Sequence, residues 1–259
     1  MNVPLKKSWL WPNLLGLDAP IVALVWQAFL AQCFSIPLRL SARCALALTV
    51  WIIYLTDRLL DTHTSHLHEA SRHRFHREWK QPLIILLVFL LILDVGIAIF
   101  WLRPAIFHNG LFALTGVIAY FGFLHFRGVT LPKELLVAGL FTTGVFLTGL
   151  TNAESRYQLI FPALAFFTLC AENLFIIEHW EQVAFQQKRT PFVPPPKVVA
   201  GILMILVLTA LFFRTEWYIA IGISALLKLI LVINEKKLGY DLRRVLVDAA
   251  LLTPVFFFK

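Results

Sequence analysis

The sequence predicts an all-α, polytopic membrane protein that forms a bundle of about nine transmembrane helices. Hydrophobic residues make up 59% of the chain and charged residues 15%. In a soluble domain, about 45–50% of the residues are usually hydrophobic and about 25% are charged. The apolar residues come in runs of about 17–22, the length that a helix needs to cross a bilayer. Several runs begin near a proline, whose missing N–H costs least in the first turn of a helix.

The expected spans form a single integral membrane domain over residues 1–259, because the loops between them are short. The spans are 14–34, 42–60, 82–102, 105–125, 133–151, 158–180, 197–213, 216–233 and 243–258. The longest loops are 61–81 and 181–196, and the second one ends in a stiff proline-rich stretch. The first residues do not have the pattern of a cleaved signal peptide. The cysteines lie in or beside apolar segments and are interpreted as packing residues: Cys33, Cys44 and Cys170.

The distribution of Lys and Arg predicts the orientation of the chain. With nine spans and a cytoplasmic N-terminus, one side of the membrane carries 16 of the 23 basic residues and the other side carries 6. This asymmetry follows the positive-inside rule, so we expect the N-terminus and the loop after Asp61 in the cytoplasm, in a protein of the cell inner membrane. The net charge of +8 is spread over short loops, which favours contact with anionic membrane lipid and argues against nucleic acid as a partner.

Two carboxylates close the second expected span. Asp57 and Asp61 are four residues apart, so one helical turn puts both on the same face. Carboxylates that close repel each other and need a counterion, either an arginine-rich loop or a hard divalent cation with oxygen ligands. The pair is therefore a candidate Mg²⁺ site.

The loop after Asp61 is rich in basic side chains and histidines. Its cations are Arg72, Arg74, Arg77 and Lys80. Basic groups beside a carboxylate pair suit a diphosphate, because Mg²⁺ bridges phosphate oxygens while arginine forks bind the others. An ordinary cytoplasmic loop, whose Arg and Lys residues only fix the topology, is the alternative. A di-iron site is disfavoured because the histidines lack H-x3-H and H-x-x-H-H spacing: His63, His66, His68, His73 and His76.

A second acidic patch ends the sixth expected span on the same side of the membrane. Glu178 and Glu181 are three residues apart and share a helix face, so the two acidic helix ends could enclose a site between them. Solvated acids at a helix end are the alternative. Charges within spans usually face the bundle interior and pair there, and we therefore expect Lys228 to pair with Asp94 or Asp248.

These motifs resemble the UbiA superfamily of intramembrane prenyltransferases, whose members have nine membrane helices and an aspartate-rich motif at the end of the second. The stretch Asp57-Arg58-Leu59-Leu60-Asp61 supplies D-R-x-x-D at that place, and a basic loop follows it. The family also tends to carry an arginine five residues before the proline that opens the fifth helix, and Arg127 and Pro132 fit this pattern. The resemblance covers the whole chain in topology and three short stretches in motifs.

The resemblance implies a transferase that moves an isoprenyl group from an isoprenyl diphosphate to a hydrophobic acceptor, either aromatic or lipid-soluble. Asp57 and Asp61 would bind Mg²⁺, while Glu178 and Glu181 would act in catalysis in place of the family's second motif. The diphosphate would be held by basic residues: Arg58, Arg72, Arg74, Arg77, Arg127 and Lys133. Two further polar residues are candidates for acceptor contact or for the second motif: Tyr54 and Asn173.

Three departures from the family pattern indicate a divergent member. Ile53 stands where the family has an asparagine, Gln81 replaces the arginine that usually closes the basic loop, and the sixth span has no D-x3-D motif. The altered second motif keeps another interpretation open, a non-catalytic protein of the same fold that binds a lipid or a partner protein. A transporter with Asp94, Lys228 and Asp248 at the midplane would predict inverted repeats, and the hydropathy pattern has none.

Overall fold

The computed structural model describes residues 10–61, 71–122, 132–151, 156–186 and 191–258, except for the side chains of residues 61 and 71–73. Within these ranges every element is helical and no strand occurs, so the expected all-α class is confirmed for them. The elements are α1 (Trp11–Leu14), α2 (Asp18–Cys33), α3 (Leu40–Asp61), α4 (Ser71–Glu78), α5 (Lys80–Trp101), α6 (Pro104–Phe121), α7 (Lys133–Leu150), α8 (Ile160–Ala184), α9 (Pro196–Phe213), α10 (Glu216–Ile233), η3 (Glu235–Lys237), α11 (Tyr240–Ala249) and η4 (Ala250–Phe257).

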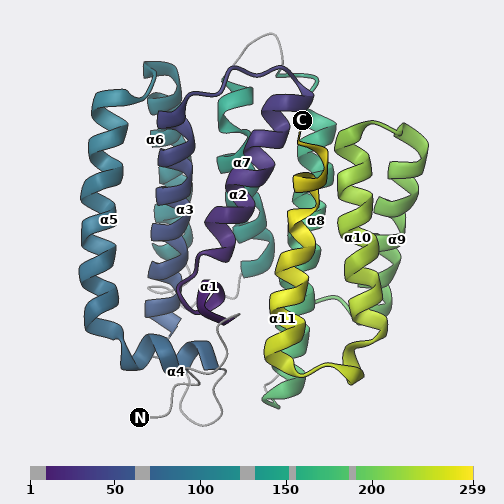
Figure 1. Cartoon of the computed structure of the whole chain (residues 1–259). Helices are drawn as coiled ribbons and strands as arrows, with labels where there is room; N and C mark the ends of the chain where they lie inside the picture. The colour runs from purple at the N-terminus through teal and green to yellow at the C-terminus, as the bar shows by residue number, and fades with distance from the viewer. Residues whose placement is uncertain (1–9, 62–70, 123–131, 152–155, 187–190, 259) are drawn as a thin grey trace.

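The long helices run side by side, and consecutive ones point in opposite directions (Figure 1). Among the described residues, seven helices are long and apolar enough to cross a membrane: α3 and α5 to α10. These seven helices match expected spans and are compatible with an integral membrane protein. The first and last expected spans correspond to α2, which has only 16 residues, and to α11 continued by the 3₁₀ segment η4. We call the end that carries α1 and α4 the lower end of the bundle (Figure 1).

The first expected span is interrupted near its start. α1 ends at Leu14, and Gly16 adopts φ +68°, a left-handed conformation that glycine tolerates best. A Cβ on Gly16 would lie 2.7 Å from Tyr54 Cδ1, so the turn also depends on the absence of a side chain. α2 then begins at Asp18. The break therefore places an aspartate at the start of a helix beside α3.

Part of the region expected as a loop is helical. α4 lies across the lower end, at a steep angle to the long helices (Figure 1). Phe75 and His76 are 2% and 1% exposed, and the Phe75 ring meets the Trp11 ring of α1 edge-on at 6.0 Å. Arg74 and Arg77 are exposed. The segment is helical because one of its faces is buried against α1, a tertiary contact that the polar composition of the loop does not indicate.

Aromatic side chains fill the interior toward the upper end. The Trp26 ring of α2 lies 5.1 Å from the Trp217 ring of α10 and 4.7 Å from the Phe166 ring of α8. Trp26 donates its Nε1–H to the Leu251 carbonyl at 2.7 Å, and Trp217 donates to the Pro162 carbonyl at 3.3 Å. Both buried indole groups are thus paired, as an apolar interior requires. The upper half of the bundle is a closed, packed core.

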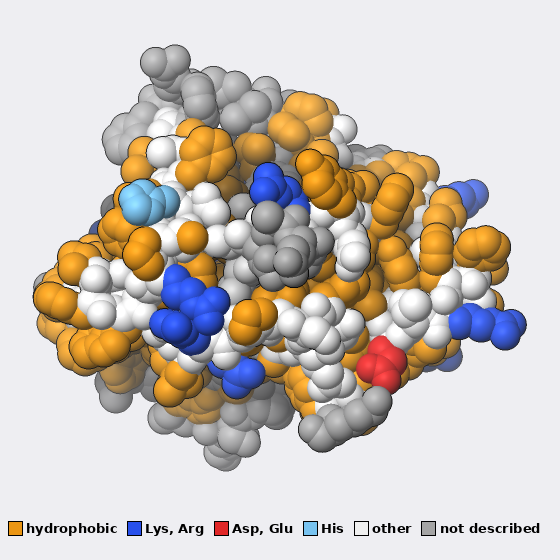
Figure 2. Space-filling view, turned by 90° about the horizontal axis from the view of Figure 1, so that it is seen from above, with side chains coloured by type: hydrophobic (Ala, Val, Ile, Leu, Met, Phe, Trp, Pro, Cys, Tyr) orange, Lys and Arg blue, Asp and Glu red, His pale blue; other side chains and the backbone are white. Residues whose placement is uncertain are grey.

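The outer helices present apolar side chains outward. Ile85 of α5, Phe112 of α6 and Phe212 of α9 are 71%, 80% and 81% exposed. Exposed apolar side chains at this density are unusual for a soluble protein and suit contact with lipid. Figure 2 looks onto the upper end, where hydrophobic groups surround the edge, basic groups lie between them and little acidic surface is visible.

The close packing of α9 on α10 depends on Gly222. A Cβ at this position would lie 2.4 Å from Ala210 Cβ, and small residues at such a contact let two membrane helices approach. We expect Gly222→Ala to lower the free energy of unfolding by about 1–3 kcal/mol, because overpacking forces the helices apart. Unfolding of the purified protein in detergent measures the change.

Gly201→Ala on α9 is the matched control for this substitution. No atom lies within 4 Å of the position of its Cβ, so added helix propensity should leave the stability unchanged or raise it. Equal losses in the two variants would contradict the packing argument.

Candidate functional site

Polar side chains gather in the lower half of the bundle. On α3, Tyr54 and Arg58 are one turn apart, and Arg58 donates from Nη2 to the Tyr54 hydroxyl oxygen at 2.5 Å. Arg58 is 9% exposed. Arg244 of α11 approaches the same hydroxyl, with its Nη2 3.5 Å from the oxygen. Two guanidinium groups from different helices therefore converge on one tyrosine.

Arg244 has donors that the described residues do not satisfy. Its side chain is 4% exposed, and its Nε and Nη1 atoms are buried without a hydrogen-bond partner. This is costly, because a charge and its donors have lost water without gaining an acceptor. An anion with several oxygens, such as a phosphate group, would satisfy both nitrogens at once. The sequence-based prediction did not include Arg244, whose one signal was its place one turn before Asp248 in the last expected span.

Asp57 is held by two neighbouring helices. Tyr120 of α6 donates its hydroxyl to Asp57 Oδ1 at 2.9 Å, and Lys133 Nζ of α7 lies 3.2 Å from the same oxygen. Arg58 also interacts electrostatically with this carboxylate. The structure thus brings Lys133, an expected diphosphate ligand, next to an expected metal ligand. Both direct contacts involve Oδ1, which leaves Oδ2 for another cation.

Several expected site residues fall outside the described part of the chain. They are Arg127 and the side chains of Asp61 and Arg72. Of the histidines considered for the disfavoured di-iron site, His63, His66, His68 and the side chain of His73 also lie there. The structure therefore describes the Asp57 half of the expected metal site and leaves the Asp61 half undescribed. Two other expected diphosphate ligands, Arg74 and Arg77, are exposed on α4.

The second acidic helix end lies at the same end of the bundle as the end of α3 (Figure 1). Glu178 accepts a hydrogen bond from Gln182 at 2.8 Å, and Glu181, 7% exposed, accepts one from the Tyr240 hydroxyl at 3.2 Å. Glu134 of α7 is close enough to Glu178 for their like charges to repel, and it follows the lysine that contacts Asp57. The start of α7 therefore lies near both acidic helix ends.

Asn173 belongs to a second polar group, centred on Asp248 of α11. Asn173 is 4% exposed and donates from Nδ2 to Asp248 Oδ1 at 2.8 Å. Its Oδ1 atom is buried without a partner. Asp248 also lies within hydrogen-bonding reach of Asp18 at the start of α2. Asn173 thus joins α8 to α11, and Asp248 extends the group to Asp18 of α2.

Lys228 is a fully buried cation next to this group. Its ammonium donates to the Leu169 carbonyl at 2.8 Å and interacts electrostatically with Asp248 and Glu172. Of its two expected partners, the structure thus brings Asp248 into range. The other, Asp94, accepts a hydrogen bond from Thr49 at 2.7 Å, because it lies on α5 against α3.

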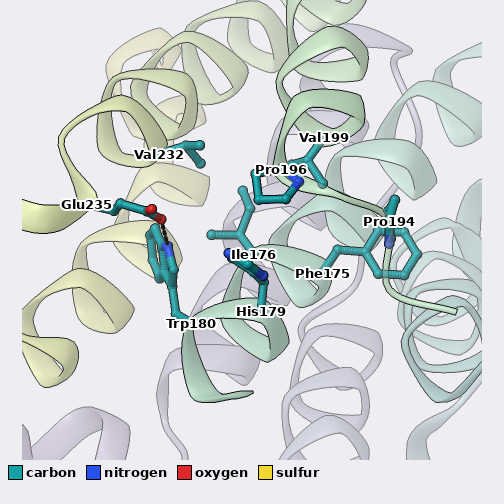
Figure 3. A pocket seen from close by; sticks show the side chains of 9 residues that line it. All are labelled: Phe175, Ile176, His179, Trp180, Pro194, Pro196, Val199, Val232 and Glu235. Carbon is teal, nitrogen blue, oxygen red and sulfur yellow. Dashed lines mark hydrogen bonds between the residues drawn. The ribbon is translucent and has the colours of Figure 1, made fainter. Parts of the chain in front are cut away.

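A small hollow lies between α8, α9 and α10. Figure 3 shows its lining, in which Trp180 donates to Glu235 Oε2 at 2.8 Å. The other side chains of the lining are Phe175, Ile176, His179, Pro194, Pro196, Val199 and Val232. The Glu235 carboxylate already accepts the hydrogen bond from Trp180, so the hollow offers mainly apolar contact. Across the described residues, no group of three or more His, Cys, Asp and Glu side chains is arranged to hold a metal ion.

Comparison with protein-family models, with curated proteins and with solved structures gives no match to this chain. The resemblance to the UbiA superfamily therefore rests on sequence motifs and stays a hypothesis. It supplies expectations for Asp57 and Lys133 and none for Arg244.

The Tyr54 hydroxyl serves both guanidinium groups of the cluster. Tyr54→Phe removes this acceptor, so we expect a loss of about 1–3 kcal/mol in the free energy of unfolding, the cost of leaving a buried donor unsatisfied. Chemical unfolding in detergent measures it. Tyr157→Phe is the control, because Tyr157 is 76% exposed. If both variants unfold like the wild type, the hydroxyl does not hold the two arginines.

Proposed function

We propose that the chain is a divergent UbiA-like prenyltransferase with nine membrane crossings, which transfers an isoprenyl group from an isoprenyl diphosphate to an aromatic or lipid-soluble acceptor. Its lower end would face the cytoplasm from the cell inner membrane, as the Lys and Arg distribution predicts. The observation that supports this most is Arg244, which approaches the same tyrosine hydroxyl as Arg58. Its buried Nε and Nη1 atoms have no partner among the described residues. Converging guanidinium groups suit a phosphate oxyanion better than any neutral ligand.

Mg²⁺ fits the donors at the end of α3. Carboxylate oxygens are the protein ligands that Mg²⁺ prefers, and it usually completes its shell with phosphate oxygens and water. Asp57 would contribute its carboxylate, whose Oδ1 already has Tyr120 and Lys133 as partners, and Asp61 would be the second ligand. When bound, Mg²⁺ would stabilise the charge that develops on the leaving diphosphate.

The protein's own side chains would hold the diphosphate and direct its departure. Arg58, Arg244 and Lys133 would donate to phosphate oxygens as the allylic C–O bond breaks and its electron pair leaves with the diphosphate. The acceptor would then form a bond to the allylic carbon and lose a proton. Glu178 and Glu181 lie at the same end of the bundle and are the proposed bases for this proton.

The packing of the upper half determines where the isoprenyl tail would run. The rings of Trp26, Phe166 and Trp217 fill the interior above the polar cluster, so the tail cannot extend straight along the bundle axis. It would leave sideways between helices of the lower half, toward the apolar outer surface. This route would place the long chain in lipid and keep only the diphosphate inside the protein.

A non-catalytic lipid-binding protein is the second candidate, and a specific observation favours it. Asp57 is already neutralised by Lys133 and Tyr120, while Glu178 and Glu181 accept hydrogen bonds from Gln182 and Tyr240. Carboxylates paired in this way do not require a metal ion. The same Arg244 site would then bind a phosphorylated lipid without breaking it.

The transferase hypothesis predicts Mg²⁺-dependent release of diphosphate. Purified protein in lipid nanodiscs, supplied with isoprenyl diphosphates of different lengths and with quinone-precursor or tetrapyrrole acceptors, should release diphosphate and form prenylated product. We expect Asp57→Asn to lower the rate by about 10²–10³-fold, because the leaving group loses its electrostatic support. Asp94→Asn, an acid of α5 bonded to Thr49, should retain the wild-type rate. Ligand binding without turnover in the wild type would favour the second candidate, and neither binding nor turnover would reject both.

Arg244 should contribute to ligand affinity whether the protein is a transferase or a non-catalytic lipid-binding protein. A charge-assisted hydrogen bond contributes about 1.5–3 kcal/mol, so we expect Arg244→Gln to raise the Kd of an isoprenyl diphosphate by about 10–100-fold, measured by calorimetry. Arg39→Gln is the control, because this arginine is exposed and precedes the start of α3, at the opposite end of that helix from Arg58. Equal Kd values for the two variants would remove Arg244 from the site.

A further inference from the structure

Asp18 and Asp248 come from opposite ends of the chain and meet inside the bundle. Asp18 begins α2 and Asp248 lies on α11, and their carboxyl groups are within hydrogen-bonding reach of each other. Two ionised carboxylates at this separation repel strongly, so one positive charge has to lie between them. The proposed chemistry of the diphosphate site uses neither residue.

One carboxylate oxygen of Asp18 and the neighbouring amide oxygen of Asn173 lack donors among the described residues. Asn13 Nδ2 donates to Asp18 Oδ2 at 2.7 Å, and Asn173 Nδ2 donates to Asp248 Oδ1 at 2.8 Å. Asp18 Oδ1 and Asn173 Oδ1 are buried and have no hydrogen-bond partner in the part of the chain that the structure describes, and the Asn173 side chain is 4% exposed. Buried acceptors of this kind are normally satisfied by a proton, an ion or water. An occupant that carries positive charge would satisfy the acceptors and relieve the repulsion together.

The charges around the pair limit the charge of the occupant. Arg58 of α3 interacts electrostatically with both carboxyl groups, and Lys228 of α10 interacts with Asp248. The direct hydrogen bonds of these two cations go elsewhere, to the Tyr54 hydroxyl and to the Leu169 carbonyl. They reduce the negative potential without filling the space between the acids. A divalent ion would add two charges next to two existing cations, whereas a monovalent one adds a single charge.

The other charged groups nearby do not change this limit. Glu172 of α8 is in electrostatic contact with Lys228 and has a buried Oε2 without a partner, so it adds negative charge. Arg244 of α11 points its Nη2 at the Tyr54 hydroxyl. Arg58, Lys228 and Arg244 thus direct hydrogen bonds to the Tyr54 hydroxyl and the Leu169 carbonyl. The need for one positive charge between the two acids therefore comes from their close approach and not from the net charge of the surroundings.

We propose that Asp18, Asp248 and Asn173 form a binding site for one monovalent positive charge, either a proton shared by the two carboxyl groups or Na⁺. The occupant holds α2 and α11 together at the lower end. Because Arg58 interacts with both acids and also with Tyr54, loss of the occupant changes the field at the neighbouring arginine pair. The site stands independently of the proposed transferase activity, because it needs neither a diphosphate nor an acceptor.

Thermal unfolding of the purified full-length protein tests the site. The apparent Tm is measured from about pH 4 to about pH 9 at constant ionic strength, once in Na⁺ and once in choline. A proton held by the folded state stabilises it at low pH, and this stabilisation is lost as the pH rises. The amide of Asp18→Asn would donate to Asp248 at every pH. For each pH unit, we therefore expect the Tm of the wild type to fall by about 3 °C more than the Tm of Asp18→Asn falls.

Two further variants make the result decisive. Asp248→Asn repeats the test from the other side of the pair if Asp18→Asn does not fold. Asp94→Asn, a partly buried acid on another helix, should keep the wild-type response. If Na⁺ raises the Tm of the wild type at high pH and not that of Asp18→Asn, the occupant is Na⁺; if the Na⁺ and choline series coincide while the pH difference persists, it is a proton. Identical dependence on pH and Na⁺ in the wild type, Asp18→Asn and Asp248→Asn would overturn the proposal.

Discussion

Charged side chains buried in an apolar bundle have to find their partners inside the bundle, and this constraint organises the lower half of the molecule. Lipid is as apolar as a leucine-rich core, so apolar contact alone distinguishes poorly between alternative helix arrangements in a membrane. Polar contacts between helices do distinguish them. Asp57 joins α3 to α6 and α7 through Tyr120 and Lys133, and Asp248 joins α11 to α8 through Asn173. The pairing of these groups specifies which helices are neighbours.

The interior is divided into two zones with different physical roles. The upper zone is a packed aromatic core in which Trp26 and Trp217 have their N–H groups satisfied by carbonyls. The lower zone contains donors and acceptors that no described residue satisfies, among them Arg244 Nε and Asp18 Oδ1. Unsatisfied groups are costly in a low dielectric, and those near Arg244 and Asp18 indicate where a ligand or ion could enter. A bundle closed at one end and polar at the other suits a site reached from one side of the membrane.

Hydropathy was sufficient to place the long helices, because each of them needs a continuous apolar run of bilayer length. It was also sufficient to place Lys133 at the start of α7, at the same end of the bundle as the end of α3. Sequence reasoning did not find the break at Gly16 or the helix α4, because both depend on contacts with distant segments. The pairing of Asp18 with Asp248 was out of reach for the same reason. Hydropathy averages over a window, so it cannot report which single charges meet across the bundle.

Asp57 and Arg244, the two central charged residues of the candidate site, differ in how well their charges are paired. Asp57 has a cation and a hydroxyl on one oxygen, whereas Arg244 has two buried nitrogens without acceptors. The described site therefore lacks an anion more than it lacks a cation. A metal ion arriving alone at Oδ2 would lie close to the Lys133 ammonium, which contacts Oδ1 of the same carboxylate, and the two cations would repel each other. A phosphate group would bind Arg244 and offer Lys133 a second acceptor, which would reduce this repulsion. The electrostatics thus favour a metal ion and a phosphate ligand that enter together, because each removes the obstacle to the other.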